Sequence, residues 1–206
     1  VRLAPLRTRL EAVGTARARR SVPLYPEAAG EVVAVNFGPG DAVEQGDLLL
    51  ALDSRDEKLA LELAELRLAD ARRMLERYTT ANSSVELTVP ETTVDTARTT
   101  LESARIERDR AQLALDRRFV TAPFDGYVGI TDIDPGERIE PTTEITTIDD
   151  RGLLLVSFEV PEAYVGRLSA GDPVAIEVWN DERTRASGTV VAIGSRVDPA
   201  SRAFTV

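Results

Sequence analysis

One stretch of this chain occurs twice, and that repeat constrains the fold more than any other feature. The first copy begins at Gly30, and the second begins at Gly126, 96 residues later. A glycine at the start, a Pro-Gly pair in the middle and an aspartate at the end recur in register: Gly30 and Gly126, Pro39-Gly40 and Pro135-Gly136, Asp53 and Asp149. A repeat at a fixed offset indicates one structural unit that is used twice.

Each copy predicts a short strand, a tight turn and a second apolar strand. Proline at the second turn position presets φ, and glycine at the third accepts a positive φ, which together are typical of a type II turn. So few strand residues cannot bury a core alone. We therefore expect the two copies to pack together as one sandwich, with the chain between them inserted as an excursion. Two unrelated hairpins that share a common turn are the alternative.

The inserted segment 54–119 predicts two long helices. Ser54 with Glu57 forms a capping box, and Thr88 with Glu91 forms a second one, with Pro90 in the first turn of the return helix. Apolar residues then recur at alternating spacings of three and four, which places them on one helix face. The larger members of this seam are Leu61, Leu68, Leu75, Val94, Leu101 and Leu115. Two matched seams joined by a short link predict an antiparallel helical hairpin that projects from the sandwich. Burial of the seam in a globular bundle is the alternative, although the stripe is narrow for it.

The flanking segments predict further β-structure. Arg17 to Leu24 alternates as a strand, Leu153 to Val160 reads as another, and a helical turn is expected from Pro161 to Leu168. Strands are also expected at 174–178 and 188–193. The fold class is therefore mainly β with a long inserted helical hairpin: a sandwich made of two sequence-distant halves plus a small antiparallel barrel, elongated as a whole.

Composition excludes most catalytic sites. The chain has 206 residues, no cysteine and no histidine, which removes thiolate and imidazole metal ligands and the usual catalytic triads. A net charge of −10 disfavours broad nucleic-acid binding. Asp132, Asp134 and Glu137 superficially suggest a calcium loop, but the EF-hand spacing fails and an acidic turn explains them better. We predict no catalytic residue, no cofactor and no metal site.

The ends of the chain indicate a piece of a longer protein. Val1 does not open a signal peptide, and no apolar run is long enough to span a membrane. The alternating run from Arg202 to Val206 stops without a turn or a cap. We expect a targeting segment before Val1 and further strands after Val206.

The segment 121–129, T-A-P-F-D-G-Y-V-G, carries a family resemblance. It resembles a signature of membrane fusion proteins, the HlyD-like periplasmic adaptors of tripartite efflux pumps. The first copy of the repeat resembles the first lipoyl-like half. Phe158 to Glu162 and the Gly171-Asp172-Pro173 turn resemble the barrel of the branch that serves resistance-nodulation-division (RND) transporters. The segment 198–202 is similar to a later barrel segment.

This resemblance implies a domain order and boundaries. Residues 54–119 would be the hairpin, and 24–53 with 120–149 the lipoyl-like halves. The barrel would comprise 17–23 and 150–206, cut short at its C-terminus. Residues 1–16 would be one edge of an incomplete membrane-proximal domain.

The resemblance also implies function and partners. Such adaptors are non-catalytic, lie in the periplasm of Gram-negative bacteria, are anchored to the inner membrane, and form ring oligomers, hexamers in the assembled pump. They link an inner-membrane efflux transporter to an outer-membrane channel, and so support export of drugs, metals or other small molecules. At the hairpin tip, Arg77 matches the family pattern, whereas Ala81 stands where a leucine is common and Thr88 where a serine is common.

Two other functions stay open at this stage. One is an adaptor for an ABC-type or other exporter. The other is a biotin or lipoate carrier, because those domains share the two-half sandwich. A carrier presents its modified lysine on a tight turn between the halves, but here segment 54–119 replaces that turn. Lys58, the only lysine, is expected in the first turn of a helix.

Overall fold

The computed structural model describes residues 10–83, 89–178 and 181–206. The chain divides into two compact units, one from Arg20 to Arg151 and one that combines Val1–Arg19 with Gly152–Val206. The first unit contains the repeat and the helices, and the second contains the remaining strands. Each unit is described below by itself.

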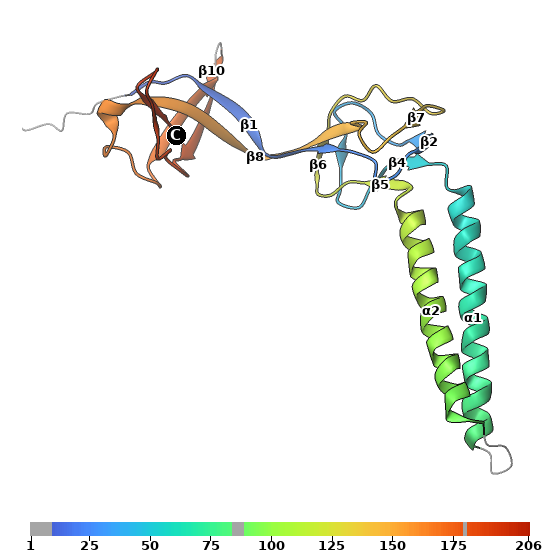
Figure 1. The fold of residues 1–206 in the computed structure, drawn as a ribbon. Helices are drawn as coiled ribbons and strands as arrows, with labels where there is room; N and C mark the ends of the chain where they lie inside the picture. The colour runs from blue at the N-terminus through green and yellow to red at the C-terminus, as the bar shows by residue number, and fades with distance from the viewer. Residues whose placement is uncertain (1–9, 84–88, 179–180) are drawn as a thin grey trace, which may run out of the picture. The chain divides into compact units, whose positions relative to one another are not determined.

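The first unit contains two small antiparallel sheets. One has the strand order β5-β4-β2-β7, with β2 at Gly30–Val35, β4 at Leu48–Leu52, β5 at Phe119–Thr121 and β7 at Arg138–Ile139. The other pairs β3 (Ala42–Val43) with β6 (Gly126–Val128), and β6 with the start of β8 (Thr146–Pro161). Each sheet contains strands from both copies of the repeat (Figure 1).

The two copies exchange hydrogen bonds reciprocally. Gly30 of β2 lies opposite Ile139, and Val43 of β3 lies opposite Gly126, which is the same pairing with the copies interchanged. The turns repeat this exchange: the Gly136 N–H donates to the Val32 carbonyl at 2.7 Å, and the Gly40 N–H donates to the Val128 carbonyl at 2.9 Å. The sandwich therefore has an internal two-fold relation, in which each half completes the other.

A single core fills the space between the halves. Val32 and Val128, which occupy the same place in the two copies, are both fully buried in it. Leu49 and Ile145 form a second matched pair in the same core. The prediction of one sandwich built from two distant halves is confirmed, and the alternative of two unrelated hairpins is wrong. Among the residues that the structure describes, none of the core residues comes from segment 54–119.

The two Pro-Gly turns have the backbone that the sequence predicts. Gly40 has φ of 82° and Gly136 has φ of 94°, a region that side chains of L-residues disfavour. Each turn closes with a bond from the residue after the glycine, Asp41 to Gly38 at 3.1 Å and Glu137 to Asp134 at 3.2 Å. Asp134 and Glu137 of the supposed calcium loop thus lie in a closed β-turn, and Asp132 precedes it.

The inserted segment forms two antiparallel helices, α1 at Arg55–Ser83 and α2 at Glu91–Asp116, which lie side by side (Figure 1). Helix α1 begins directly after Ser54, as predicted. The predicted start of α2 is wrong in detail, because Pro90 is the N-cap and the helix begins at Glu91. Proline disfavours a helical conformation in the residue before it, which agrees with a helix that begins after Pro90. Thr88, the proposed cap, lies outside the described residues.

The second unit is built around the later part of β8. This strand pairs with β1 (Gly14–Leu24) and with β12 (Ala203–Thr205), and β12 pairs with β11 (Val197–Asp198). A separate ladder joins β9 (Pro173–Val178) to β10 (Asp181–Thr189), and one turn of 3₁₀-helix spans Glu162–Tyr164. Val160 and Phe204 are buried here.

The predicted strand at 188–193 is wrong, because β10 ends at Thr189. Thr189 lies opposite Pro173, the first residue of β9, and beyond it Val190 exchanges bonds only with Gly171 and Asp172 in the turn that precedes β9.

Candidate functional site

The hairpin seam lies where the heptad spacing places it. The six predicted seam residues, Leu61, Leu68, Leu75, Val94, Leu101 and Leu115, are all half-buried. The fully buried positions are alanines, Ala64 and Ala71 on α1 and Ala97 and Ala104 on α2. Two helices alone cover a small side chain completely, whereas a leucine extends beyond the contact. Because the leucines remain part-exposed, the alternative of a globular bundle around the hairpin is wrong.

The base of the hairpin is connected to the sandwich by charged contacts. Arg118, just after α2, donates from Nη2 to Glu57 Oε1 in the first turn of α1 at 2.5 Å. The Glu57 side chain, which the capping-box interpretation assigns to the start of α1, thus ties the two ends of the hairpin together. Arg117 lies 3.4 Å from Glu27, with both side chains exposed.

The entrance to α1 carries a local ion pair. Arg55 donates from Nη2 to Asp53 Oδ2 at 2.6 Å and from Nε to Oδ1 at 3.0 Å, and its backbone N–H also points to Oδ1 at 3.2 Å. The hydrogen bonds from the Arg55 side chain and backbone lower the pKa of Asp53 to about 2. The charged form of Asp53 is therefore favoured in the folded chain.

This shift predicts how the start of α1 responds to acid. Because the folded-state pKa of Asp53 lies below its ordinary value of 3.8, its charge stabilises the fold above that value, and the contribution disappears as pH falls towards about 2. We expect Asp53→Asn to lower the thermal midpoint at pH 7 and to converge with the wild type between about pH 4 and pH 2. Circular dichroism melts at each pH measure this difference. Glu65→Gln, in an exposed mid-helix position, controls for the loss of one charge, and a constant gap between Asp53→Asn and wild type across the titration would refute the assignment.

The tip-side half of the hairpin holds the predicted contact residues. Arg77 lies exposed in the last two turns of α1, and Ala81 follows four residues later on the same helix. Thr88, the third predicted tip residue, lies outside the described residues. A groove of about 310 Å³ opens nearby between Met74 and Tyr78 of α1 and a row of threonines on α2. Thr96 and Thr100 donate their hydroxyls to carbonyls one turn earlier, which leaves their methyl groups to line the groove.

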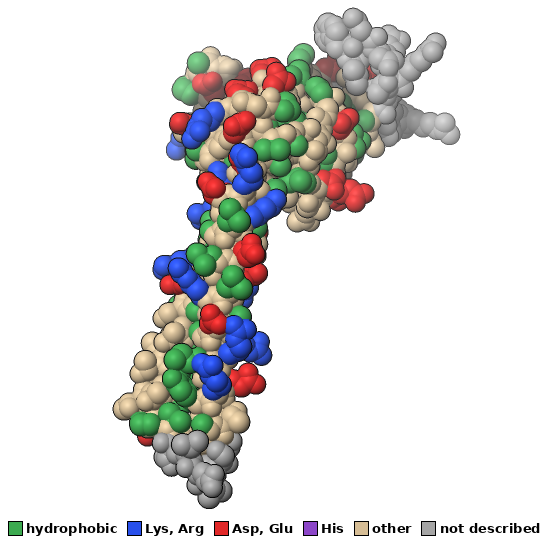
Figure 2. Space-filling view, turned by 90° about the vertical axis from the view of Figure 1, so that its right-hand side faces the viewer, with side chains coloured by type: hydrophobic (Ala, Val, Ile, Leu, Met, Phe, Trp, Pro, Cys, Tyr) green, Lys and Arg blue, Asp and Glu red, His purple; other side chains and the backbone are tan. Residues whose placement is uncertain are grey.

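Two apolar stripes on the outer edges of the hairpin were missed by the sequence reasoning. Each stripe residue lies two positions from a seam residue, and two residues turn a helix by about 200°, so the stripes face away from the seam. Their members are exposed: Leu59, Leu63 and Leu66 on α1, and Ile106 and Leu113 on α2. Figure 2 shows apolar side chains along the hairpin, between charged ones. A second set of leucines at spacings of four and three was the available signal.

The register of the helices places both stripes at the same level. Arg67 of α1 lies 3.5 Å from Glu107 of α2, and Glu57 meets Arg118 near the base. Under this antiparallel register Ile106 lies level with residues near Leu68, and Leu113 lies level with Leu61. The flat hairpin therefore exposes apolar side chains on both edges at one height.

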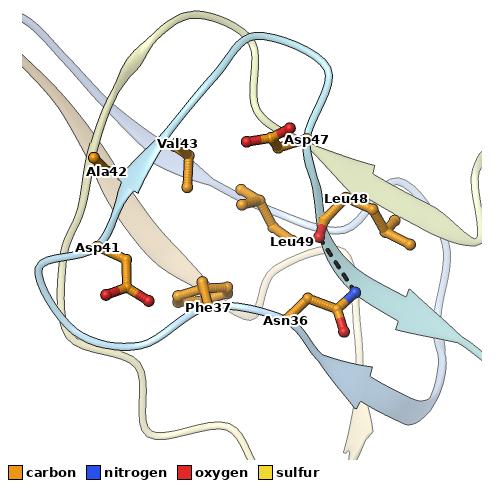
Figure 3. A pocket seen from close by; sticks show the side chains of 8 residues that line it. All are labelled: Asn36, Phe37, Asp41, Ala42, Val43, Asp47, Leu48 and Leu49. Atoms are coloured by element: carbon orange, nitrogen blue, oxygen red, sulfur yellow. Dashed lines mark hydrogen bonds between the residues drawn. The ribbon is translucent and has the colours of Figure 1, made fainter.

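An open depression of about 310 Å³ lies on the sandwich, lined by eight residues: Asn36, Phe37, Asp41, Ala42, Val43, Asp47, Leu48 and Leu49 (Figure 3). Its polar groups serve the local chain. Asp41 accepts the Gly38 N–H at 2.7 Å, Asp47 accepts the Glu44 N–H at 2.8 Å, and Asn36 donates to the Leu48 carbonyl at 3.3 Å. The carboxylates thus cap turns, and the depression has no arrangement of nucleophile and base.

Two further features are absent from the residues that the structure describes. No cluster of three or more acidic side chains among them has the geometry to hold a metal ion. None of the described helices combines the length and the apolar character needed to cross a membrane. The exposed tip and the outer stripes of the hairpin form the candidate site.

Comparisons with known proteins place these features in a family. The family model of CzcB-like barrel-sandwich hybrid domains matches residues 20–150. Multidrug resistance protein MdtA of Escherichia coli O9:H4 (strain HS) is 30% identical over 209 residues, which cover 92% of this chain and 50% of MdtA. The chain thus spans about half the length of the curated relatives it matches.

Solved structures agree in fold at lower sequence identity. A MacA-MexA chimeric protein with the Pseudomonas aeruginosa MexA alpha-hairpin domain superposes with a TM-score of 0.81 at 18% identity, over 95% of this chain and 73% of the chimera. Membrane fusion protein Spr0693 of Streptococcus pneumoniae R6 gives a TM-score of 0.75 at 20% identity, over 95% of this chain and 90% of that one. Taken with the family model, these likenesses lead to one conclusion: the chain belongs to the family of CzcB-like barrel-sandwich hybrid proteins and is a homologue of the membrane fusion proteins.

Proposed function

We propose that this chain is part of a non-enzymatic periplasmic adaptor that links an inner-membrane RND-type efflux transporter to an outer-membrane channel. The observation that carries the proposal is the hairpin inserted between two halves of one sandwich, which makes a spacer attached at a compact joint. The family match and the likeness to MdtA support the same role. Since MdtA is described as a multidrug resistance protein, small drug-like molecules are the proposed class of cargo.

The tip of the hairpin is the proposed contact with the channel. Arg77 is exposed and lies far along α1 from the sandwich. We also propose a location for the whole protein, in the periplasm of a Gram-negative bacterium with an anchor in the inner membrane. The domain boundaries given by the resemblance, with the barrel at 17–23 and 150–206, belong to this proposal.

Reversing the charge at the tip tests the channel contact. We expect Arg77→Glu in the full-length protein to weaken co-purification of the outer-membrane channel by about tenfold. The reversed charge would be repelled by an acidic partner and could no longer donate hydrogen bonds to a polar one. Co-purification of the inner-membrane transporter stays unchanged. Arg72→Glu, another exposed arginine on α1, is the matched control. Equal retention of the channel by wild type and Arg77→Glu would remove the tip from the proposal.

Copies of the adaptor are proposed to assemble side by side into a ring, a hexamer in the assembled pump. The stripe Leu59-Leu63-Leu66 of one copy would meet Ile106 and Leu113 of the next, a head-to-tail contact that closes as a ring. Charges nearer the tip complement this pairing. The α1 edge carries Arg73 and Arg77, whereas the α2 edge carries Asp95 and Glu102 at matching levels.

A charge in the stripe tests the ring. We expect Leu66→Asp in the full-length protein to shift it from oligomer to monomer in sedimentation velocity, because an unpaired carboxylate would be buried in the contact. Hairpin helicity stays as in the wild type, because Leu66 is exposed in the single chain. Ile130→Asp, at an exposed position of the sandwich, is the matched control. An unchanged oligomer would exclude the outer edges as the contact.

Two alternatives are separated by simple observations. An adaptor for an ABC-type exporter would co-purify with that class of transporter instead. A biotin or lipoate carrier would show a mass increase on Lys58. That lysine lies in the first turn of α1, where its backbone N–H bonds to the Ser54 carbonyl at 3.0 Å, and not on a tight turn between the halves.

A further inference from the structure

Arg118 contacts three separate segments at the base of the hairpin. Its Nη2 donates to Glu57 in α1 at 2.5 Å, and its Nη1 donates to the Ala29 carbonyl just before β2 at 2.7 Å. Its own carbonyl accepts the Leu52 N–H at the end of β4 at 2.8 Å. Only 21% of the Arg118 side chain and 16% of the Glu57 side chain are exposed, so the pair is largely shielded from water.

The covalent connections alone leave the hairpin one free rotation. The hairpin joins the sandwich at two places, through Ser54 and through Arg117, and two points define an axis about which a rigid body turns. Arg118 lies on the sandwich side of this axis, where the Ala29 carbonyl holds its side chain, and its bond to Glu57 reaches α1 and therefore opposes that rotation. We propose that Arg118 is the positioning residue that fixes the direction in which the hairpin leaves the sandwich.

The contact between Arg118 and Glu57 is stronger than the adjacent contact between Arg117 and Glu27. A charge-assisted bond in a shielded site is roughly twice as strong as a neutral one, and removing one partner leaves the other charge unpaired. The adjacent pair of Arg117 and Glu27 is solvent-exposed at 3.4 Å, and such pairs contribute little. Arg118 therefore holds the direction, and Arg117 serves as its matched control.

Gly30 provides the space that the Arg118 guanidinium occupies. A Cβ built on Gly30 would lie 2.9 Å from Arg118 Nη1. At Gly126, the equivalent residue of the second copy, the added Cβ would instead lie 2.8 Å from the Asp149 carbonyl oxygen. The equivalent glycines thus make room for different groups in the two copies. Gly30→Ala displaces the Arg118 guanidinium without changing any charge.

The positioning role of Arg118 is argued from its contacts alone. Only the reason why the hairpin needs a fixed direction rests on the proposed function. At 1.5 Å per residue the 29 residues of α1 span about 44 Å, so a tilt of about 10° at the base moves the tip by about 8 Å. A tip displaced by that distance would miss a docking site in the channel. Direction is therefore a property that a spacer of this length must hold.

Spin-label distances measure the direction without any partner. The chain has no cysteine, so introduced cysteines are the only labelling sites. Thr142→Cys on the sandwich with Ser103→Cys on α2 reports the direction, and Glu65→Cys with Ser103→Cys reports the hairpin itself; all three positions are exposed. We expect one narrow distance distribution for the first pair in the otherwise unchanged chain. Arg118→Met broadens it and removes its single maximum, whereas the second pair keeps its distance.

The remaining variants decide between outcomes. Arg117→Met leaves both distributions unchanged, and Gly30→Ala and Glu57→Gln each broaden the first pair while circular dichroism remains that of the folded chain. A narrow first distribution in folded Arg118→Met overturns the proposal. If that variant does not fold, a narrow distribution in both Gly30→Ala and Glu57→Gln overturns it equally. Because no transporter or channel is present, this result is independent of whether the adaptor role holds.

Discussion

Replacing Ile148 by aspartate is expected to unfold the sandwich. Ile148 is 0% exposed on β8 and lies opposite Val128, which is also 0% exposed, so the two residues join the halves at the centre of the core. The change removes a buried apolar side chain and places a carboxylate where no partner can reach it. The cost is on the order of 5 kcal/mol or more, comparable with the whole stability of a small domain.

The measurement is chemical unfolding with a matched control. We expect Ile148→Asp to lose its cooperative transition and to bind a hydrophobic dye in the absence of denaturant. Ile130→Asp introduces the same change at a position that is 77% exposed, and its unfolding midpoint stays close to that of the wild type. A cooperative transition of normal midpoint in Ile148→Asp would mean that the halves do not share one core.

Placing aspartate at Leu101 is expected to fray the hairpin while the sandwich stays folded. Leu101 is half-buried in the seam, between the buried residues Ala97 and Ala104. A carboxylate there loses solvation without gaining a partner, at a cost of about 2 to 3 kcal/mol. Two helices without further support have little stability to spare. The core of the sandwich contains no residue of the hairpin, so it is not affected directly.

Helical signal and limited proteolysis separate these two parts. We expect Leu101→Asp to lose much of its ellipticity at 222 nm, because α1 and α2 hold nearly all the helix in the described residues. Protease then cuts within 54–119 and leaves the sandwich strands protected. Leu66→Asp carries the same change on the outer edge and keeps its helicity. An intact, protected hairpin in Leu101→Asp would contradict the seam.

The sequence was informative where a pattern reports burial directly. The repeat predicted the shared core because equivalent residues, such as Val32 and Val128, must be buried in both copies. The heptad spacing predicted the hairpin because helix faces follow from period alone. The ends of elements were less predictable. Helix α2 begins at Glu91, directly after Pro90, and β10 ends at Thr189, where the partner segment turns at residues 171–172.

The functional surface was harder to predict for a physical reason. The outer stripes have the same residue types and spacings as the seam, so periodicity cannot say which stripe a neighbouring helix covers. Arg118 looked like an ordinary charged residue after a helix. Its role depends on Glu57 and on the Ala29 carbonyl, which are 61 and 89 residues away in the chain, and a local pattern does not report such contacts.

The crossed bonds between Val32 and Gly136 and between Val128 and Gly40 also bear on how the protein can be divided. Each half lacks part of its own sheet, and the other half supplies that part, so neither half is an independent folding unit. A chain severed at the hairpin tip should nevertheless reassemble from two fragments, with the seam holding them in register while the sandwich closes. The architecture therefore offers a split reporter: the two fragments remain separate polypeptides, and their association restores one fold.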